Sequence, residues 1–265
     1  MRRIIIIGTA LAVLGVAAVA VASSINTYTA KISFSPTKGG SAKKPVVVSF
    51  TTDFTANGTN GNRTAPLTDV KTTIYGLKVN SKGFPTCTLA QISAAKNDTG
   101  CPPKALAATG YITAVIGPTN DQSSGASGTL PCDPLLHVWN GGNGKLVFFF
   151  VDQAPNHQCA NGALTTGSVP PYPGTISYSG KNLVQDTPVP SYVSFPLAGI
   201  EGSLESLHLN WLKQSTVVKG KKVFDITSVG CAKGNKRPFS VTFKANEPNQ
   251  PTETDTVNGS AKCTK

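Results

Sequence analysis

The chain has 265 residues, a formal net charge of +11, 39% hydrophobic residues and only 14% charged residues. Disordered chains combine low hydrophobicity with high net charge per residue, whereas the apolar residues here cluster in strand-length runs, so a packed core can form. Gly (26) and Pro (19) are frequent and long helical periodicity is missing, which is typical of folds built from short strands and turns.

The first 22 residues have the pattern of an export signal. Arg2 and Arg3 give a positive start, residues 4–21 are mainly apolar, and Ala20-Val21-Ala22 satisfies the small-residue rule for cleavage. An apolar run of this length also borders on membrane-spanning length, so an uncleaved N-terminal anchor is the alternative. We expect cleavage after Ala22, which leaves residues 23–265 as a single β-sandwich domain.

Apolar and β-branched runs predict the elements of the N-terminal half in chain order. Residues 28–35 and 46–50 form strands around a Pro/Gly/Lys connector, residues 53–69 form a polar loop, and residues 70–79 return to strand. Leu89, Ile92 and Ala95 share a helical face, and Thr88 suits an N-cap, so one short helix follows. Residues 111–116 form the next strand.

The clearest hairpin joins residues 135–139 to residues 145–151. The connecting Asn-Gly-Gly-Asn-Gly run contains the residues that tolerate positive φ. The second strand is apolar on both faces, so we expect it to be central and covered on both sides. This arrangement favours two layers packed face to face over an open sheet.

The C-terminal half predicts further strands at 174–179, 191–197, 203–212, 215–218, 222–228 and 238–244. In the third of these, Leu207, Leu209 and Trp211 face one way and the intervening polar residues face the other, as in a half-buried antiparallel strand. The predicted fold class is therefore all-β: a two-layer antiparallel β-sandwich or jelly roll with one short helix.

All six cysteines follow the predicted signal: Cys87, Cys101, Cys132, Cys159, Cys231 and Cys263. An even number in an exported chain predicts three disulfides, which can pair in 15 ways. Proximity along the chain favours pairing in sequence order. Structural zinc sites need cysteines two to four residues apart, and the closest pair here is 14 apart, so we predict no metal.

The charge of the chain is uneven. Without Arg2 and Arg3 the net charge is +9 (22 basic minus 13 acidic), and residues 213–244 contain eight basic residues against Asp225 alone. Lys219, Lys221 and Lys222 fall on a predicted turn, where their side chains project into solvent. A one-sided field attracts polyanions non-specifically, so these lysines are candidate contacts for anionic cell-envelope polymers. The alternative is that they keep the protein soluble and protect strand edges.

No pattern assigns a catalytic residue, a cofactor or a specific nucleic-acid site. The G-x-S-x-G and Walker motifs are absent, and the cysteines are consumed in disulfides. Glu201 and Glu205 are the best carboxylate pair, although residues four apart on a strand have Cα atoms about 13 Å apart. Jelly-roll glucanases use an E-x-D-x-E strand, and Ser203 occupies the middle position here. A non-catalytic secreted or envelope protein is the first hypothesis, a polysaccharide hydrolase using this pair the second, and a secreted inhibitor the third.

The motif G-F-P-T-C at residues 83–87, the C-P pair at 101–102 and the Gly-containing strand after residue 108 resemble a pattern in uncharacterised exported proteins of actinobacteria. The similarity extends to Cys231, the strand that follows it and the last cysteine. The resemblance implies an exported β-sandwich in which Cys87 is joined to Cys101. It implies no catalytic residue.

Overall fold

The computed structural model describes residues 25–162, 164–247 and 250–264. The predicted signal, residues 1–22, lies outside this part of the chain. The described chain is all-β and antiparallel with two short helices, which confirms the predicted fold class. Within the described residues, no helix has the length and apolar character needed to cross a membrane.

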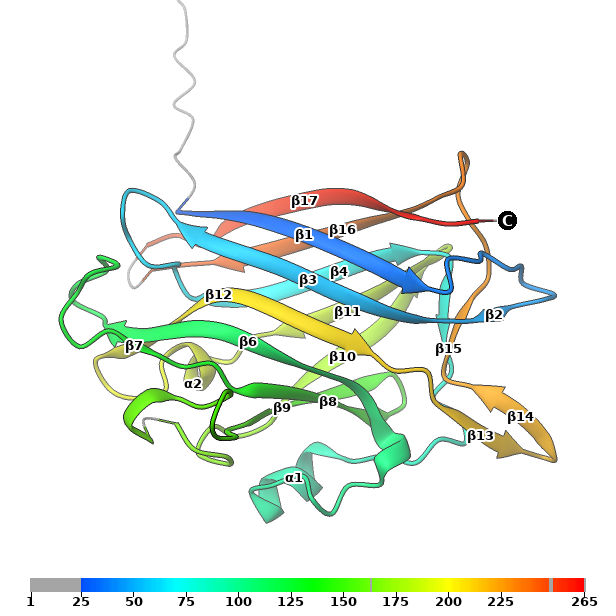
Figure 1. The fold of residues 1–265 in the computed structure, drawn as a ribbon, viewed down its shortest axis with the longest axis horizontal. Helices are drawn as coiled ribbons and strands as arrows, with labels where there is room; N and C mark the ends of the chain where they lie inside the picture. Colours follow the sequence, from blue (N-terminus) through cyan, green and yellow to red (C-terminus); the bar gives the residue numbers. More distant parts are fainter. Residues whose placement is uncertain (1–24, 163, 248–249, 265) are drawn as a thin grey trace, which may run out of the picture.

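A single 12-stranded antiparallel sheet forms most of the molecule (Figure 1). Its spatial order is β1 (Asn26–Ser35), β3 (Ser49–Gly58), β12 (Ile200–Trp211), β6 (Leu106–Pro118), β8 (Leu135–Gly142), β9 (Lys145–Val151), β10 (Tyr172–Ser179), β11 (Asn182–Pro188), β4 (Leu67–Tyr75), β16 (Lys236–Ala245) and β17 (Glu253–Lys262), with β7 (Leu130–Pro131) beside β6. The sheet curls until β1 and β17 lie side by side, so its two layers are opposite walls of one nearly closed cylinder.

The seam between β1 and β17 is joined at both ends. At one end the backbone N–H of Ile25 donates to Glu253 Oε2 at 2.8 Å. At the other end the N–H of Gly39 donates to the Thr264 carbonyl at 2.7 Å. Between them, Tyr28 on β1 stacks on Phe243 of β16 with ring centroids 4.2 Å apart. The cylinder is thus closed by packing and by end contacts.

Small elements cover the two ends of the cylinder. One end carries the three-stranded sheet of β2 (Val46–Val47), β15 (Ile226–Ser228) and β5 (Leu77–Val79), and the separate hairpin of β13 (Ser215–Val218) and β14 (Lys221–Phe224). The opposite end is covered by loops and by α2 (Ser191–Ser194) (Figure 1). Single 3-10 turns occur at Pro103–Ala105 and Ala160–Gly162.

The β8–β9 hairpin is where the sequence predicts it, and β9 is covered on both faces. Phe148 packs in the main core inside the cylinder. Phe149 packs outside it in a second cluster with Ile92 and Cys87. The outer cover is therefore not a second sheet but α1 (Leu89–Ala95) and its loop.

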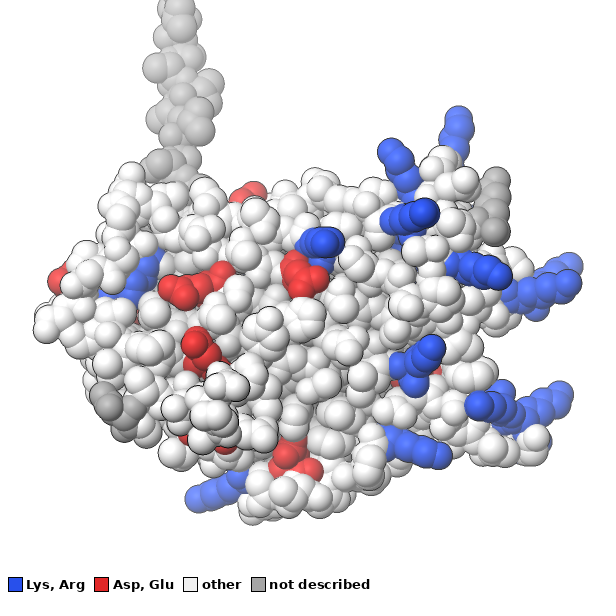
Figure 2. Space-filling view, viewed as in Figure 1, with Lys and Arg blue, Asp and Glu red and all other residues white. Residues whose placement is uncertain are grey.

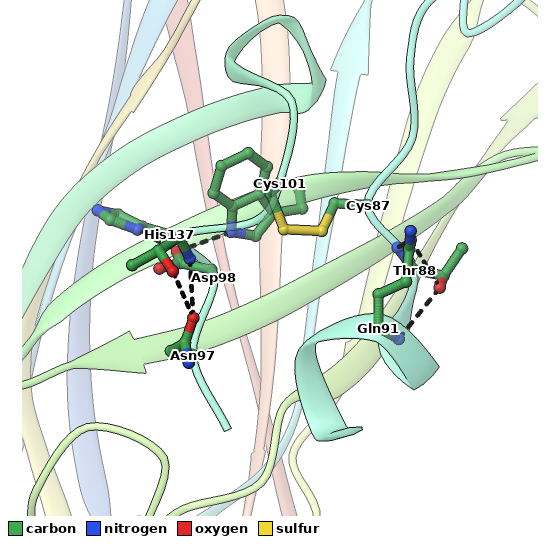
Figure 3. Close-up of a disulfide and its surroundings, with 9 residues drawn as sticks. Cys87, Thr88, Gln91, Asn97, Asp98, Cys101 and His137 are labelled. Atoms are coloured by element: carbon green, nitrogen blue, oxygen red, sulfur yellow. Dashed lines mark hydrogen bonds and ion pairs between the residues drawn. A yellow bond between two sulfur atoms is a disulfide. The ribbon is translucent and has the colours of Figure 1, made fainter. Parts of the chain in front are cut away.

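Local signals predict the position and the N-cap of α1, but not its buried face. Thr88 Oγ1 accepts from the N–H of Gln91, and the Gln91 side chain accepts from the N–H of Thr88, which together make a capping box (Figure 3). Of the predicted apolar face, Ile92 is buried, whereas Leu89 and Ala95 are exposed. The disulfides join Cys87 to Cys101, Cys132 to Cys159 and Cys231 to Cys263, in sequence order.

Several elements differ from the sequence-based prediction. The polar stretch predicted as loop 53–69 is mostly strand, because Phe54 and Ala56 alternate inward along β3. The predicted strand 191–197 begins instead with α2. Strands β11 and β17 are not predicted at all, because β17 is polar along its length and β11 is interrupted by Gln185 and Asp186.

Candidate functional site

The exposed lysines gather at one end of the cylinder, which we call the basic end. Figure 2 shows most Lys and Arg side chains over β13, β14 and the neighbouring loops, with Asp and Glu over the rest of the face. Among the described residues, the acidic side chain at this end is that of Asp225, which is buried. The register of the strands places the following exposed lysines there: Lys38, Lys43, Lys44, Lys78, Lys82, Lys104, Lys145, Lys181, Lys213, Lys219, Lys221, Lys222, Lys233, Lys236 and Lys262.

The β13–β14 hairpin presents the three lysines that the sequence singles out. Lys219 and Gly220 form its turn with φ of 50° and 73°, a left-handed pair that suits a tight two-residue hairpin turn. Lys219, Lys221 and Lys222 are all exposed, and Lys222 Nζ lies 5.3 Å from the centre of the Phe224 ring. Their charged groups therefore stand in solvent on a projecting element.

The basic end differs in membership from the segment 213–244. Lys244 lies at the far end of β16, where it pairs with Asp69 at 3.1 Å, and Arg237 is fully buried. Lysines from separate turns, among them Lys145 and Lys181, join the basic end instead. No run of charge in the sequence marks these lysines, because only the strand order brings their turns together.

A pocket of about 220 Å³ opens at the basic end. Lys104 and Lys145 lie in its lining together with Asp225, Trp211 and Tyr178. The Tyr178 hydroxyl donates to the Val79 carbonyl at 3.1 Å and accepts from its N–H at 2.7 Å, which fixes the ring at the pocket wall. The pocket thus combines cations with a single carboxyl.

Asp225 fixes the base of the β13–β14 hairpin. Its Oδ1 accepts from the N–H of Gln214 at 2.7 Å and from the N–H of Ile226 at 2.8 Å. Burial raises the pKa of this carboxyl to about 6, although the backbone hydrogen bonds act in the opposite direction. The hairpin is therefore positioned by a carboxyl that titrates near neutral pH.

Glu201 and Glu205 do not form a common site. Glu201 is fully buried and pairs with Arg63 at 3.1 Å, while Gln122 donates to its other oxygen at 3.0 Å. A register shift between Leu204 and Ser206 places Glu205 at a β-bulge, and its side chain is exposed. One carboxyl is therefore buried against an arginine, whereas the other stands in solvent at a strand irregularity. This arrangement does not favour the hydrolase hypothesis.

Two histidines each contact one carboxylate. His137 Nδ1 lies 2.6 Å from Asp98 Oδ2, which also accepts from Trp139 Nε1 at 3.1 Å, beside the Cys87–Cys101 disulfide (Figure 3). Burial raises the pKa of Asp98, but the hydrogen bonds and charge of His137 outweigh it and leave the pKa below its ordinary value. These contacts attach the α1 loop to β8.

The second pair lies on the outer wall. His208 Nδ1 is 2.5 Å from Asp53 Oδ1, and the Tyr111 ring packs between His208 and His157. Among the described residues, no serine, threonine or cysteine side chain is hydrogen-bonded to the ring of His137 or His208. A nucleophile activated by either histidine would need such a contact.

Within the described ranges, no group of three or more His, Cys, Asp or Glu side chains is placed to hold a metal ion.

In comparisons with known proteins, no family model, curated protein or solved structure matches the chain.

Proposed function

We propose that the protein is a non-catalytic, secreted or cell-envelope-associated binding protein that holds anionic envelope polymers at its basic end. The observation that carries this proposal is the separation of charge: exposed lysines from many separate turns at one end, against one buried carboxyl there. Strand order alone collects these lysines.

The chemistry of the side chains suits a polymer better than a compact ligand. Lysine ammonium groups are strongly hydrated point charges on flexible stems, so they follow a repeating anionic chain without fixed geometry. A field of one sign also raises the local concentration of oppositely charged partners and speeds their association. The expected binding is therefore tolerant of sequence and polymer type but sensitive to salt.

The test uses immobilised polyphosphate and a poly-carboxylate, with retention of the protein measured between 0.05 and 1 M salt. Over this range the Debye length falls to about 3 Å, so retention should be strong at the low end and lost at the high end. Retention that does not change with salt would contradict the proposal.

A charge-matched pair of variants locates the contact. Changing Lys219, Lys221 and Lys222 together to Gln should lower the salt concentration at which the protein elutes. The control changes three exposed lysines elsewhere, Lys31, Lys71 and Lys96, to Gln, and should elute close to the wild type. If the salt concentration of elution falls equally in both variants, binding depends only on net charge, and a binding site at the basic end is excluded.

A further inference from the structure

The side chain of Tyr178 crosses the mouth of the cylinder at the basic end. Ile176, which lies two residues earlier in β10 and therefore on the same strand face, packs against the main core. Tyr178 thus starts from the inner face of the wall. Its hydroxyl reaches the backbone of Val79 on β5, where it donates one hydrogen bond and accepts another. The ring is therefore anchored at both of its ends and has a fixed position.

Tyr178 stands between two pockets of the basic end. It lines the pocket of about 220 Å³ that contains Asp225, and it also lines a second pocket of about 580 Å³ that contains Lys181. We call these the Asp225 pocket and the Lys181 pocket. Tyr178 is 49% exposed, more than any other aromatic residue that the structure describes. Because its hydroxyl is engaged with Val79, the part of the side chain that is left for a ligand is the ring.

The two pockets differ in charge. The Lys181 pocket contains Lys78 and Lys181, and the described residues that line it include no carboxyl group. The Asp225 pocket also contains lysines, but these are accompanied by Asp225, Asn80 and Ser81. An anionic group is therefore favoured in the Lys181 pocket. Hydroxyl groups, which both donate and accept hydrogen bonds, suit the Asp225 pocket.

The ring and the kind of cation together narrow the class of polymer. Polyphosphate and acidic peptides have no rigid ring to place on Tyr178. Nucleic acids have rings, but arginine is the residue of choice for their recognition, and the two arginines of the described chain, Arg63 and Arg237, are buried. A sugar ring presents a face of C–H groups, which packs well against the negative face of an aromatic ring. Acidic polysaccharides combine this face with hydroxyls and carboxylates.

We propose that the anionic polymer held at the basic end is an acidic polysaccharide. One of its sugar rings stacks on Tyr178, with its carboxylate between Lys78 and Lys181, and the neighbouring sugar places hydroxyls in the Asp225 pocket. This inference rests on the proposed function and narrows it. The lysines attract any polyanion, whereas Tyr178 adds a preference for a chain of sugar rings.

The test compares polygalacturonate with poly-L-glutamate of matched chain length. Both carry one carboxylate per unit, and only the first contains sugar rings. At about 0.1 M salt, where charges act over a Debye length of about 10 Å, the wild type should bind both polymers. It should bind polygalacturonate about fivefold more tightly, which is the size expected for one aromatic contact. Single-stranded poly-dT, measured alongside, should bind more weakly than polygalacturonate.

Three variants assign the preference to the ring. Tyr178→Leu leaves the charge unchanged, so its affinity for polygalacturonate should fall to that for poly-L-glutamate, with the salt dependence of both unaltered. Tyr178→Phe keeps the ring and should keep the preference. The matched control is Tyr192→Leu, which removes an exposed tyrosine at the opposite end whose hydroxyl also donates to a backbone carbonyl, that of Pro171. This control should behave as the wild type. Unfolding transitions establish that each variant is folded.

The outcomes separate this inference from the proposed function. Equal, salt-sensitive binding of the two polymers by the wild type would overturn the inference and leave the proposed function intact, whereas failure to bind either polymer at low salt would overturn both. Tighter binding of poly-dT than of polygalacturonate would identify a nucleic acid instead. A preference that persists in folded Tyr178→Leu would also contradict the inference.

A measurement on the wild type decides if Tyr178→Leu does not fold. Selective irradiation of the aromatic protons of the protein should transfer saturation to the ring C–H protons of trigalacturonate, because a stacked sugar lies in contact with the tyrosine ring. Absence of this transfer from a bound trisaccharide would overturn the inference.

Discussion

Buried charges are paired at one end of the cylinder and unpaired at the other. At the end opposite the lysines, the guanidinium of Arg63 pairs with Glu201 and donates to the carbonyls of Pro118, Asp121 and Ser123. At the basic end, Arg237 is equally buried but contacts no carboxylate among the described residues. Two arginines of the same burial are thus held by different means.

Arg237 is held by weak partners. It donates to Ser228 Oγ at 2.5 Å, lies 3.4 Å from Cys263 Sγ, and stacks its guanidinium 4.3 Å from the centre of the Phe34 ring. Among the described residues, its Nε and Nη1 atoms have no hydrogen-bond partner, and burial lowers its pKa to about 10. Within the described part of the chain, the one acidic side chain at the basic end, Asp225, forms no ion pair with this buried cation.

Breaking the ion pair between Arg63 and Glu201 should have the largest effect on stability. Glu201→Gln leaves the buried Arg63 without a counter-charge, and loss of one partner of a buried ion pair costs about 3–5 kcal/mol of the free energy of unfolding. Urea unfolding monitored by circular dichroism measures this loss. The double variant Arg63→Met/Glu201→Met should recover most of it. A loss below about 1 kcal/mol in Glu201→Gln would contradict the role given to the pair.

The raised pKa of Asp225 predicts that the stability contributed at the basic end depends on pH. Because its folded pKa is raised to about 6, its contribution to stability is complete below about pH 4 and is lost as the pH rises through 6. Asp225→Asn keeps the Oδ1 acceptor but cannot ionise. Between pH 4 and pH 7 the wild type should therefore lose about 2 kcal/mol relative to this variant. Parallel stability curves for the two proteins would exclude the raised pKa.

Replacing Arg237, the buried cation at the basic end, should have the smallest effect on stability. Arg237→Met removes a buried charge that has no carboxylate partner among the described residues, and it keeps the packing on Phe34. We expect the free energy of unfolding to change by less than about 1 kcal/mol, with an increase favoured. The matched change Arg63→Met should be clearly destabilising, because it leaves the buried Glu201 without a counter-charge. Equal losses in the two variants would mean that the two ends do not differ.

The sequence predicts elements well where one residue pattern dominates. The apolar run of β9, the alternation of Leu207, Leu209 and Trp211, and the cap at Thr88 each produce the expected element. Strand β17 escapes prediction because it is an edge strand whose alternate side chains are polar. Its pairing with β16 is decided by the sheet and not by its own composition.

The site depends on information that no local pattern contains. The bulge beside Glu205 requires one residue of β12 to lack a partner on β6, and this register is set by both strands together. The same applies to the basic end, where lysines from distant turns meet only because of the strand order. The hairpin lysines 219, 221 and 222 are predictable because their turn residues lie beside them in sequence.

The seam has a consequence for how the molecule assembles. The contact between Ile25 and Glu253 joins residues 228 apart in sequence, so the cylinder closes only after the last described strand is in place. Contacts of such long range form slowly, because the loop entropy is lost before the contact is gained. Until then β17 does not cover the edge of β1, and an open strand edge can template association with another chain. The time between the folding of β1 and the arrival of β17 is therefore the interval in which the protein is most prone to aggregate.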